Sequence, residues 1–285
     1  MTPTYVFVHG SGTSSASWQA TQREMALRGH RTVAVNLPGR GAGFSLAYHT
    51  QDLATFAREP SAAAWITGTR TVAELVEVVR RAHVNGPVIL VGHSFGGLPL
   101  TGAGNAVPGL IDRIVYIAAQ CPVDRRAGDY LTRPEWAETD LLPITTSLYL
   151  GNPAEQGFIR VNWRGARGEA LKAMHAAMGA DLSEQEFAML LATMQPDEIW
   201  WQDQPSWDIR AQRDTWGRIP RTYIRTLLDH SMPLTAQDTY ITEGDALTPG
   251  NPWDVRSIAS GHAGFLRRPA ELIEILTDLA VPALH

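Results

Sequence analysis

Short apolar runs alternate with segments of helical spacing toward both ends of the chain. Residues 5–8 and 88–91 are unbroken apolar runs, which are typical of strands buried on both faces of a parallel sheet. Further strands are predicted at residues 32–35, 111–119, 223–228 and 255–258. Apolar spacing predicts helices at residues 16–27, 71–83, 98–106 and 271–279. Strands that alternate with helices predict an α/β fold with a mostly parallel sheet and helices on both faces.

The pattern changes between residues 120 and 217, where six tryptophans and helical spacing occur without a clear buried strand. We therefore predict a mainly helical cap at residues 120–217, inserted between two parts of one core, residues 1–119 and 218–285. Residues 44–68 are too long for an ordinary connection, and we expect a loop or short helices near the cap there.

Composition and charge narrow the classes of partner. The chain of 285 residues is 44% hydrophobic and 19% charged, which is typical of a folded protein with a large core. Its net charge is -5 without a basic run, so we expect a small-molecule substrate and no nucleic acid. No apolar stretch reaches the ~20 residues that span a bilayer, and no signal peptide is recognised, so no membrane partner is expected. With Cys121 as its single cysteine, the chain is expected in the reducing cytoplasm, and a homodimer is one candidate assembly.

Residues 92–96 read Gly-His-Ser-Phe-Gly, between a predicted strand and a predicted helix. In that context the G-x-S-x-G pattern forms a tight turn that exposes its serine at the edge of the sheet. Glycines two residues to either side leave room for the turn. The alternative is a glycine-rich turn without chemistry, but the placement favours Ser94 as a nucleophile.

A serine nucleophile needs an imidazole to take its proton and an acid to orient that imidazole. His262 follows the last predicted strand and completes the chain order serine, acid, histidine. For the acid, Asp229 follows the predicted strand at residues 223–228, whereas Asp124 follows the strand before it. We favour Asp229 and keep Asp124 as its rival. An aspartate that caps a turn is the structural alternative for either residue.

Attack on an ester carbonyl also needs backbone donors for the developing oxyanion. The backbone N–H of Phe95, directly after the nucleophile, and that of Ser11, in the loop after the first strand, are the candidates. Gly10-Ser11-Gly12 is not a dinucleotide fingerprint, because Ser15 replaces its third glycine and no acid ends the second strand. No metal-binding motif is present, so we predict neither a metal nor a cofactor.

The tryptophans of the predicted cap suggest an apolar, aromatic-lined pocket over Ser94. A purely structural role is the alternative for each of them. They are Trp136, Trp163, Trp200, Trp201, Trp207 and Trp216.

The sequence resembles the α/β-hydrolase superfamily, and within it the branch of methylesterases, hydroxynitrile lyases and their bacterial relatives. The resemblance is carried by residues 6–11 with Trp18, residues 88–97, residues 223–225 leading to Asp229, and Gly261-His262. It covers residues 4–119 and 220–280, and the cap matches less closely. It implies Ser94, Asp229 and His262 as the catalytic triad and Ser11 and Phe95 as oxyanion donors.

Within that branch, the lyases that cleave cyanohydrins carry a lysine directly after the catalytic histidine. This chain has Ala263 at that position. We therefore predict a serine hydrolase that cleaves a carboxylic ester of a small apolar or aromatic substrate through an acyl-serine intermediate. A hydroxynitrile-lyase-like or cyclase-type reaction with the same triad is one alternative. A catalytically weak ligand-binding receptor is the other.

Overall fold

The computed structural model of the protein describes residues 2–41, 43 and 45–279. Its centre is a sheet of six parallel strands in the order β2-β1-β3-β4-β7-β8, which confirms the predicted parallel sheet. The strands are β1 (Thr4–Val8), β2 (Arg31–Val35), β3 (Val88–His93), β4 (Arg113–Ile117), β7 (Arg221–Thr226) and β8 (Asp254–Ile258).

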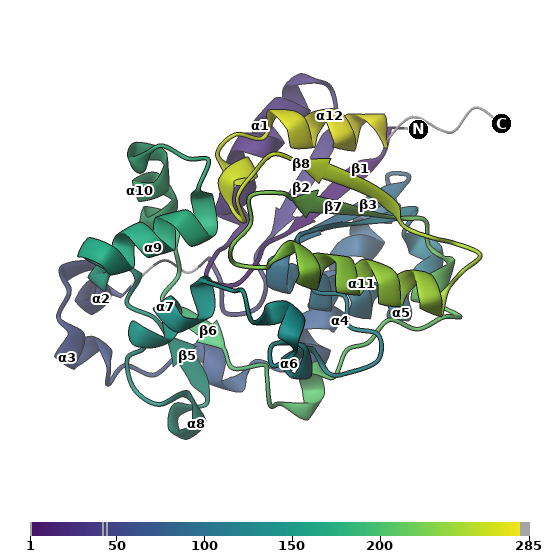
Figure 1. Ribbon diagram of the computed structural model, residues 1–285. Coiled ribbons are helices and arrows are strands. Elements are labelled where there is room, and N and C mark those ends of the chain that lie inside the picture. The colour runs from purple at the N-terminus through teal and green to yellow at the C-terminus, as the bar shows by residue number, and fades with distance from the viewer. Residues whose placement is uncertain (1, 42, 44, 280–285) are drawn as a thin grey trace.

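Alternate side chains of the central strands enter two separate apolar cores. Tyr5 and Phe7 belong to the core beneath α1 and α12, whereas Val6 and Val8 belong to the core beneath α4, α5 and α11. Figure 1 shows these two groups of helices on opposite faces of the sheet. The helices are α1 (Gln19–Leu27), α4 (Gly68–His83), α5 (Gly97–Ala106), α11 (Leu234–Leu247) and α12 (Ala270–Asp278). Burial on both faces explains why these strands are continuous apolar runs.

The segment between β4 and β7 forms a separate group of elements at one end of the sheet (Figure 1). Its helices are α6 (Ala127–Tyr130), α7 (Leu141–Ser147), α8 (Pro153–Gln156), α9 (Gly168–Gly179) and α10 (Glu184–Thr193). It also contains a short antiparallel pair, β5 (Phe158–Arg160) and β6 (Asp197–Ile199), which the sequence pattern does not reveal. Strands of three residues are too short to show an alternating pattern, and β6 begins with two acidic residues.

The long connection after β2 forms short helices beside this cap, as the sequence suggests. These are α2 (Leu46–Thr50), α3 (Leu53–Phe56) and the 3-10 turn η2 (Ala62–Trp65); Phe44 lies outside the described residues. Arg160 of the cap donates to the backbone carbonyls of Phe56 and Glu59. Within the described ranges, no helix has both the length and the apolar character needed to cross a bilayer.

Candidate active site

The turn after β3 holds Ser94 in a strained backbone conformation. Its φ of 55° lies in the left-handed region, which a residue with a side chain rarely adopts. The two glycines of the turn are required by close approach: a Cβ on Gly92 would lie 2.6 Å from a Leu100 methyl carbon, and one on Gly96 would lie 2.7 Å from the His9 carbonyl oxygen. Non-glycine strain of this kind is often found at functional sites.

The structure brings Ser94, His262 and Asp229 together in a chain of contacts. His262 Nε2 lies 3.0 Å from Ser94 Oγ, and His262 Nδ1 lies 2.7 Å from Asp229 Oδ2. Asp229 follows β7 and His262 follows β8, so adjacent parallel strands deliver both residues to the same edge of the sheet. Because a carboxylate only accepts hydrogen bonds, it holds the Nδ1 proton and leaves Nε2 free to accept the Ser94 proton.

The Asp229 carboxylate is itself held in one orientation. Its side chain is fully buried; Oδ2 also accepts the Thr226 hydroxyl at 2.7 Å, and Oδ1 accepts the backbone N–H groups of Ser231 and Met232, both at 2.8 Å. Asp124, the rival acid, is exposed, and its backbone contacts Tyr130 and Arg210. The geometry therefore favours Asp229.

Two hydrogen bonds orient the Ser11 N–H. The Gly10 carbonyl oxygen accepts the Thr13 hydroxyl and the His9 Nδ1–H, each at 2.9 Å. In a trans peptide unit the C=O and the next N–H point in opposite directions, so these bonds also fix the Ser11 N–H. Gly10 packs closely against Ser94, because a Cβ added to it would lie 2.9 Å from Ser94 Cβ. Ser11 lines the cavity above Ser94, and Phe95 is buried directly after Ser94.

Two further histidines near Ser94 and His262 are held in the neutral form by their surroundings. Burial and the nearby Arg40 charge lower the pKa of His9 to about 3. Burial and the charge of His262 lower the pKa of His93 well below its usual range, and its ring lies 4.6 Å from that of His262. A neutral His93 would not oppose a positive charge on the neighbouring His262 ring.

A cavity of about 150 Å³ opens over Ser94 and His262. An apolar cavity of roughly that volume holds a benzene ring. Of the six cap tryptophans, three line the cavity. Trp207 instead packs on Phe95, with ring centroids 5.2 Å apart, and Trp216 packs on Trp253 in the core. Trp200 is half-buried against an apolar core. The cavity's apolar lining includes Leu131, Trp136, Leu142, Ile159, Val161, Trp163, Met194 and Trp201.

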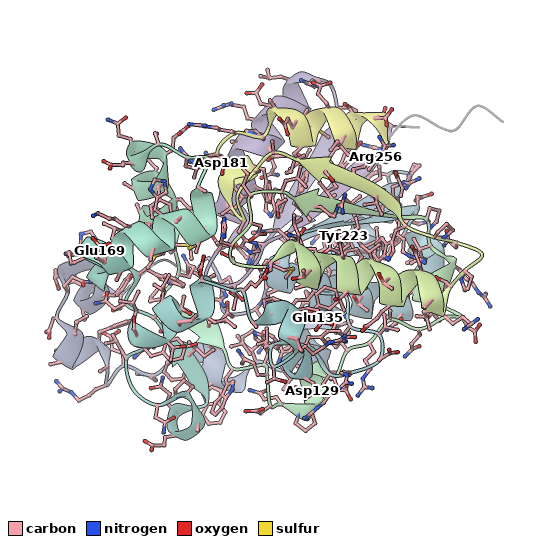
Figure 2. All side chains as sticks on the ribbon, viewed as in Figure 1. Asp129, Glu135, Glu169, Asp181, Tyr223 and Arg256 are labelled. Atoms are coloured by element: carbon pink, nitrogen blue, oxygen red, sulfur yellow. The ribbon has the colours of Figure 1, made fainter. Side chains whose placement is uncertain are left out.

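The cap also contacts the loop that carries His262. Asp181, between α9 and α10, accepts the Gly261 backbone N–H at 2.8 Å, and Figure 2 shows it where the cap meets this loop. Ala263, after the histidine, is 3% exposed and lines the cavity. Lys172 pairs with Glu169, which Figure 2 places at the outer end of α9. The Lys172 side chain is 76% exposed. No lysine therefore serves the cavity in the part of the chain that the structure describes.

The chain belongs to the alpha/beta hydrolase family, which it matches over residues 5–275. Polyneuridine aldehyde esterase from Rauvolfia serpentina is 23% identical over 282 residues, covering 97% of this chain and 95% of that protein. Methylesterase 10 from Arabidopsis thaliana is 24% identical over 277 residues, covering 97% and 91%. The crystal structure of a pyrethroid hydrolase from Sphingobium faniae JZ-2 matches with a TM-score of 0.71 and 19% identity over 100% of each chain. These matches confirm the predicted fold and the resemblance to the methylesterase branch, and their names support an esterase.

Sequence reasoning missed Thr226, which contacts Asp229, and it missed the pair of Arg40 and Glu198, which contacts the Ser11 loop through Gly12. Thr226 is the last residue of β7 and lies three residues before Asp229. That short separation is the one sequence feature that could have indicated a contact between the two side chains. Nothing local links Arg40 to Glu198, which is 158 positions away. Among the described residues, no three His, Cys, Asp or Glu side chains are grouped so as to hold a metal ion.

Proposed function

We propose that this protein is a serine hydrolase that cleaves a carboxylic ester of a small apolar or aromatic substrate. The observation that carries the proposal is the unbroken contact from Asp229 through His262 to Ser94, which opens into an apolar cavity. The esterase names of the relatives support the same reaction.

The reaction proceeds through an acyl-serine. Ser94 Oγ attacks the ester carbonyl carbon while His262 Nε2 takes the hydroxyl proton. The negative charge on the carbonyl oxygen is stabilised by the N–H groups of Ser11 and Phe95. The alcohol leaves with the proton that His262 returns. Water, activated by the same histidine, then releases the acid and restores Ser94.

The cavity explains the expected substrate class. Its lining is mostly apolar, so burial of an alkyl or aryl group supplies the binding energy. Its volume of about 150 Å³ suits a group on the scale of one aromatic ring.

The proposal is tested with a fluorophosphonate probe and a panel of aryl acetates and methyl esters. We expect peptide mass spectrometry to find the label on Ser94, and a burst of aryl alcohol equal to the enzyme concentration where deacylation is slower than acylation. Ser94→Ala is the control and should show neither. Labelling of another residue, or unchanged turnover by Ser94→Ala, would overturn the proposed nucleophile.

A further inference from the structure

A carboxylate from the cap reaches the loop that carries the proposed oxyanion donor. Glu198 of β6 lines the cavity, and its Oε2 accepts the Gly12 backbone N–H at 2.8 Å. Gln195, just before β6, donates its backbone N–H to the Gly12 carbonyl oxygen at 2.7 Å. The cap therefore holds both backbone polar groups of the residue that follows Ser11.

These contacts bear on Ser11 because each peptide unit is rigid. The unit before Ser11 is held at the Gly10 carbonyl by Thr13 and His9. The unit after Ser11 contains the Gly12 N–H, and Glu198 holds that group. With the planes on both sides anchored, the Ser11 N–H keeps its direction before a substrate binds, which is what an oxyanion donor requires.

Arg40 compensates the charge that this arrangement brings into the cavity. Its guanidinium pairs with Glu198 Oε1, and the two side chains are only 4% and 8% exposed. The Ile199 backbone N–H donates to the same oxygen at 2.7 Å. An unpaired carboxylate in the cavity would repel a developing oxyanion, and the guanidinium offsets that repulsion.

We propose that Glu198, neutralised by Arg40, is a positioning residue that fixes the Ser11 loop and so links the cap to the oxyanion site. It acts through Gly12 and does not take part in bond making. This inference rests on the proposed function, because it assumes that Ser94 attacks a carbonyl carbon.

A second ion pair on the same strand offers a matched control. Arg160 binds Asp197 through Nε–Oδ1 and Nη2–Oδ2 contacts of 2.6 and 2.7 Å. Asp197 directly precedes Glu198, but its side chain contacts Arg160 and not the Ser11 loop. We therefore expect Asp197→Asn to disturb β6 but to leave in place the bond between Glu198 and Gly12 and the bond from Arg40 to the Asp197 backbone carbonyl.

The probe pair is trifluoroacetophenone and acetophenone. In the fluorinated ketone, Ser94 Oγ bonds to the carbonyl carbon, the C=O π pair moves to oxygen, and His262 keeps the serine proton. The adduct thus carries an oxyanion, whereas acetophenone binds mainly as the intact ketone. Both ketones place a phenyl group in the cavity, but only the fluorinated one forms the oxyanion adduct. The ratio of their inhibition constants therefore reports oxyanion stabilisation separately from binding in the cavity.

We expect Glu198→Ala to lower kcat and weaken trifluoroacetophenone binding by about 10- to 100-fold, on the scale of a lost oxyanion donor. Acetophenone binding should change by less than about 2-fold. Glu198→Gln, whose amide oxygen can still accept the Gly12 N–H, should lose much less. Arg40→Met should lose more activity than Arg40→Met/Glu198→Gln, because the second substitution removes the unpaired charge. Asp197→Asn should keep the wild-type inhibition ratio.

Equal weakening of both ketones by Glu198→Ala, or an unchanged ratio, would overturn the positioning role. The positioning role would also be overturned if Asp197→Asn changed the inhibition ratio as Glu198→Ala does. It would likewise be overturned if Arg40→Met/Glu198→Gln were no more active than Arg40→Met. Thermal melts identify variants that do not fold. If Glu198→Ala does not fold, Arg40→Met/Glu198→Leu replaces it, because this double variant has no acceptor for the Gly12 N–H and leaves no unpaired charge. If the wild type itself binds both ketones equally and Ser94 is not labelled, the proposed function fails instead.

Discussion

His262 Nε2 lies 3.0 Å from Ser94 Oγ, although 168 positions of sequence separate the two residues. Two features hold this contact: the strained turn on one side and the Asp229 carboxylate on the other. The strained turn is expected to lower the stability of the fold, whereas the Asp229 carboxylate is expected to support activity. Substitutions at Ser94 and at Asp229 can therefore test the two features separately.

Ser94→Ala should remove ester turnover, whereas Ser94→Gly should remove it and also stabilise the fold relative to Ser94→Ala. The φ of 55° strains any residue with a Cβ, and glycine relieves a strain of about 1–2 kcal/mol. Greater backbone entropy of glycine in the unfolded chain offsets roughly 0.5–1 kcal/mol of that gain. Denaturant unfolding of both variants measures the difference. A glycine variant less stable than the alanine variant would show that the turn is not strained.

Asp229→Asn should lower kcat by orders of magnitude, about 10⁴-fold if it behaves as in serine proteases. An amide in place of Oδ2 can present its NH₂ group to His262, which favours the wrong tautomer of the imidazole. Asp124→Asn is the matched control, since Asp124 is exposed, and it should stay within about 3-fold of wild type. The reverse order of the two effects would reassign the acid to Asp124.

Stability should fall below neutral pH partly because His9 is buried and neutral. Its pKa is about 3 in the folded protein against ~6.5 for an unperturbed histidine, so the unfolded state binds the proton first. The contribution of neutral His9 to the free energy of unfolding is fully present above the pKa of the unfolded state. It is lost as pH falls from that value toward 3, by at most about 1.4 kcal/mol per pH unit. His9→Gln should flatten the slope of unfolding free energy between about pH 6 and pH 4, whereas exposed His83→Gln should not. Parallel slopes for wild type and His9→Gln would contradict the assignment.

Local signals account for the parts of the site that the sequence predicts. The turn around Ser94 is predictable because an apolar strand, a five-residue pattern and a helix follow one another without a break. Asp229 and His262 follow from chain order, because each comes after a strand of a parallel sheet.

The parts that sequence reasoning missed depend on long-range contacts or on weak local patterns. Arg40 and Glu198 meet only because the cap folds onto the connection after β2, and the same carboxylate reaches Gly12 in the loop after β1. The helix α11 is also missed, because its buried face consists of Ala236, Gln237, Tyr240 and Gly244, of which only two are clearly apolar. Burial of a glycine or a glutamine is decided by its neighbours in the fold, which the local pattern does not contain.

The residue after His262 leads to a prediction about reaction type. Cyanohydrin cleavage needs a positive charge near the departing cyanide, and Ala263 supplies none while Lys172 is paired with Glu169 on the outside of the cap. We therefore expect the wild type to hydrolyse aryl and methyl esters and to release little benzaldehyde from mandelonitrile. Ala263→Lys should raise the ratio of aldehyde release to ester turnover, because its ammonium would lie at the cavity wall.

Ala263→Met is the control for that substitution, since it adds similar bulk without a charge. Ala263 is 3% exposed, so both variants crowd the cavity, and only a difference between them reports the charge. Both reactions are followed on the same enzyme preparations, with Ser94→Ala as the blank. Rapid aldehyde release by the wild type without ester turnover would make the lyase the better assignment, because the triad would then act as acid and base without an acyl-serine.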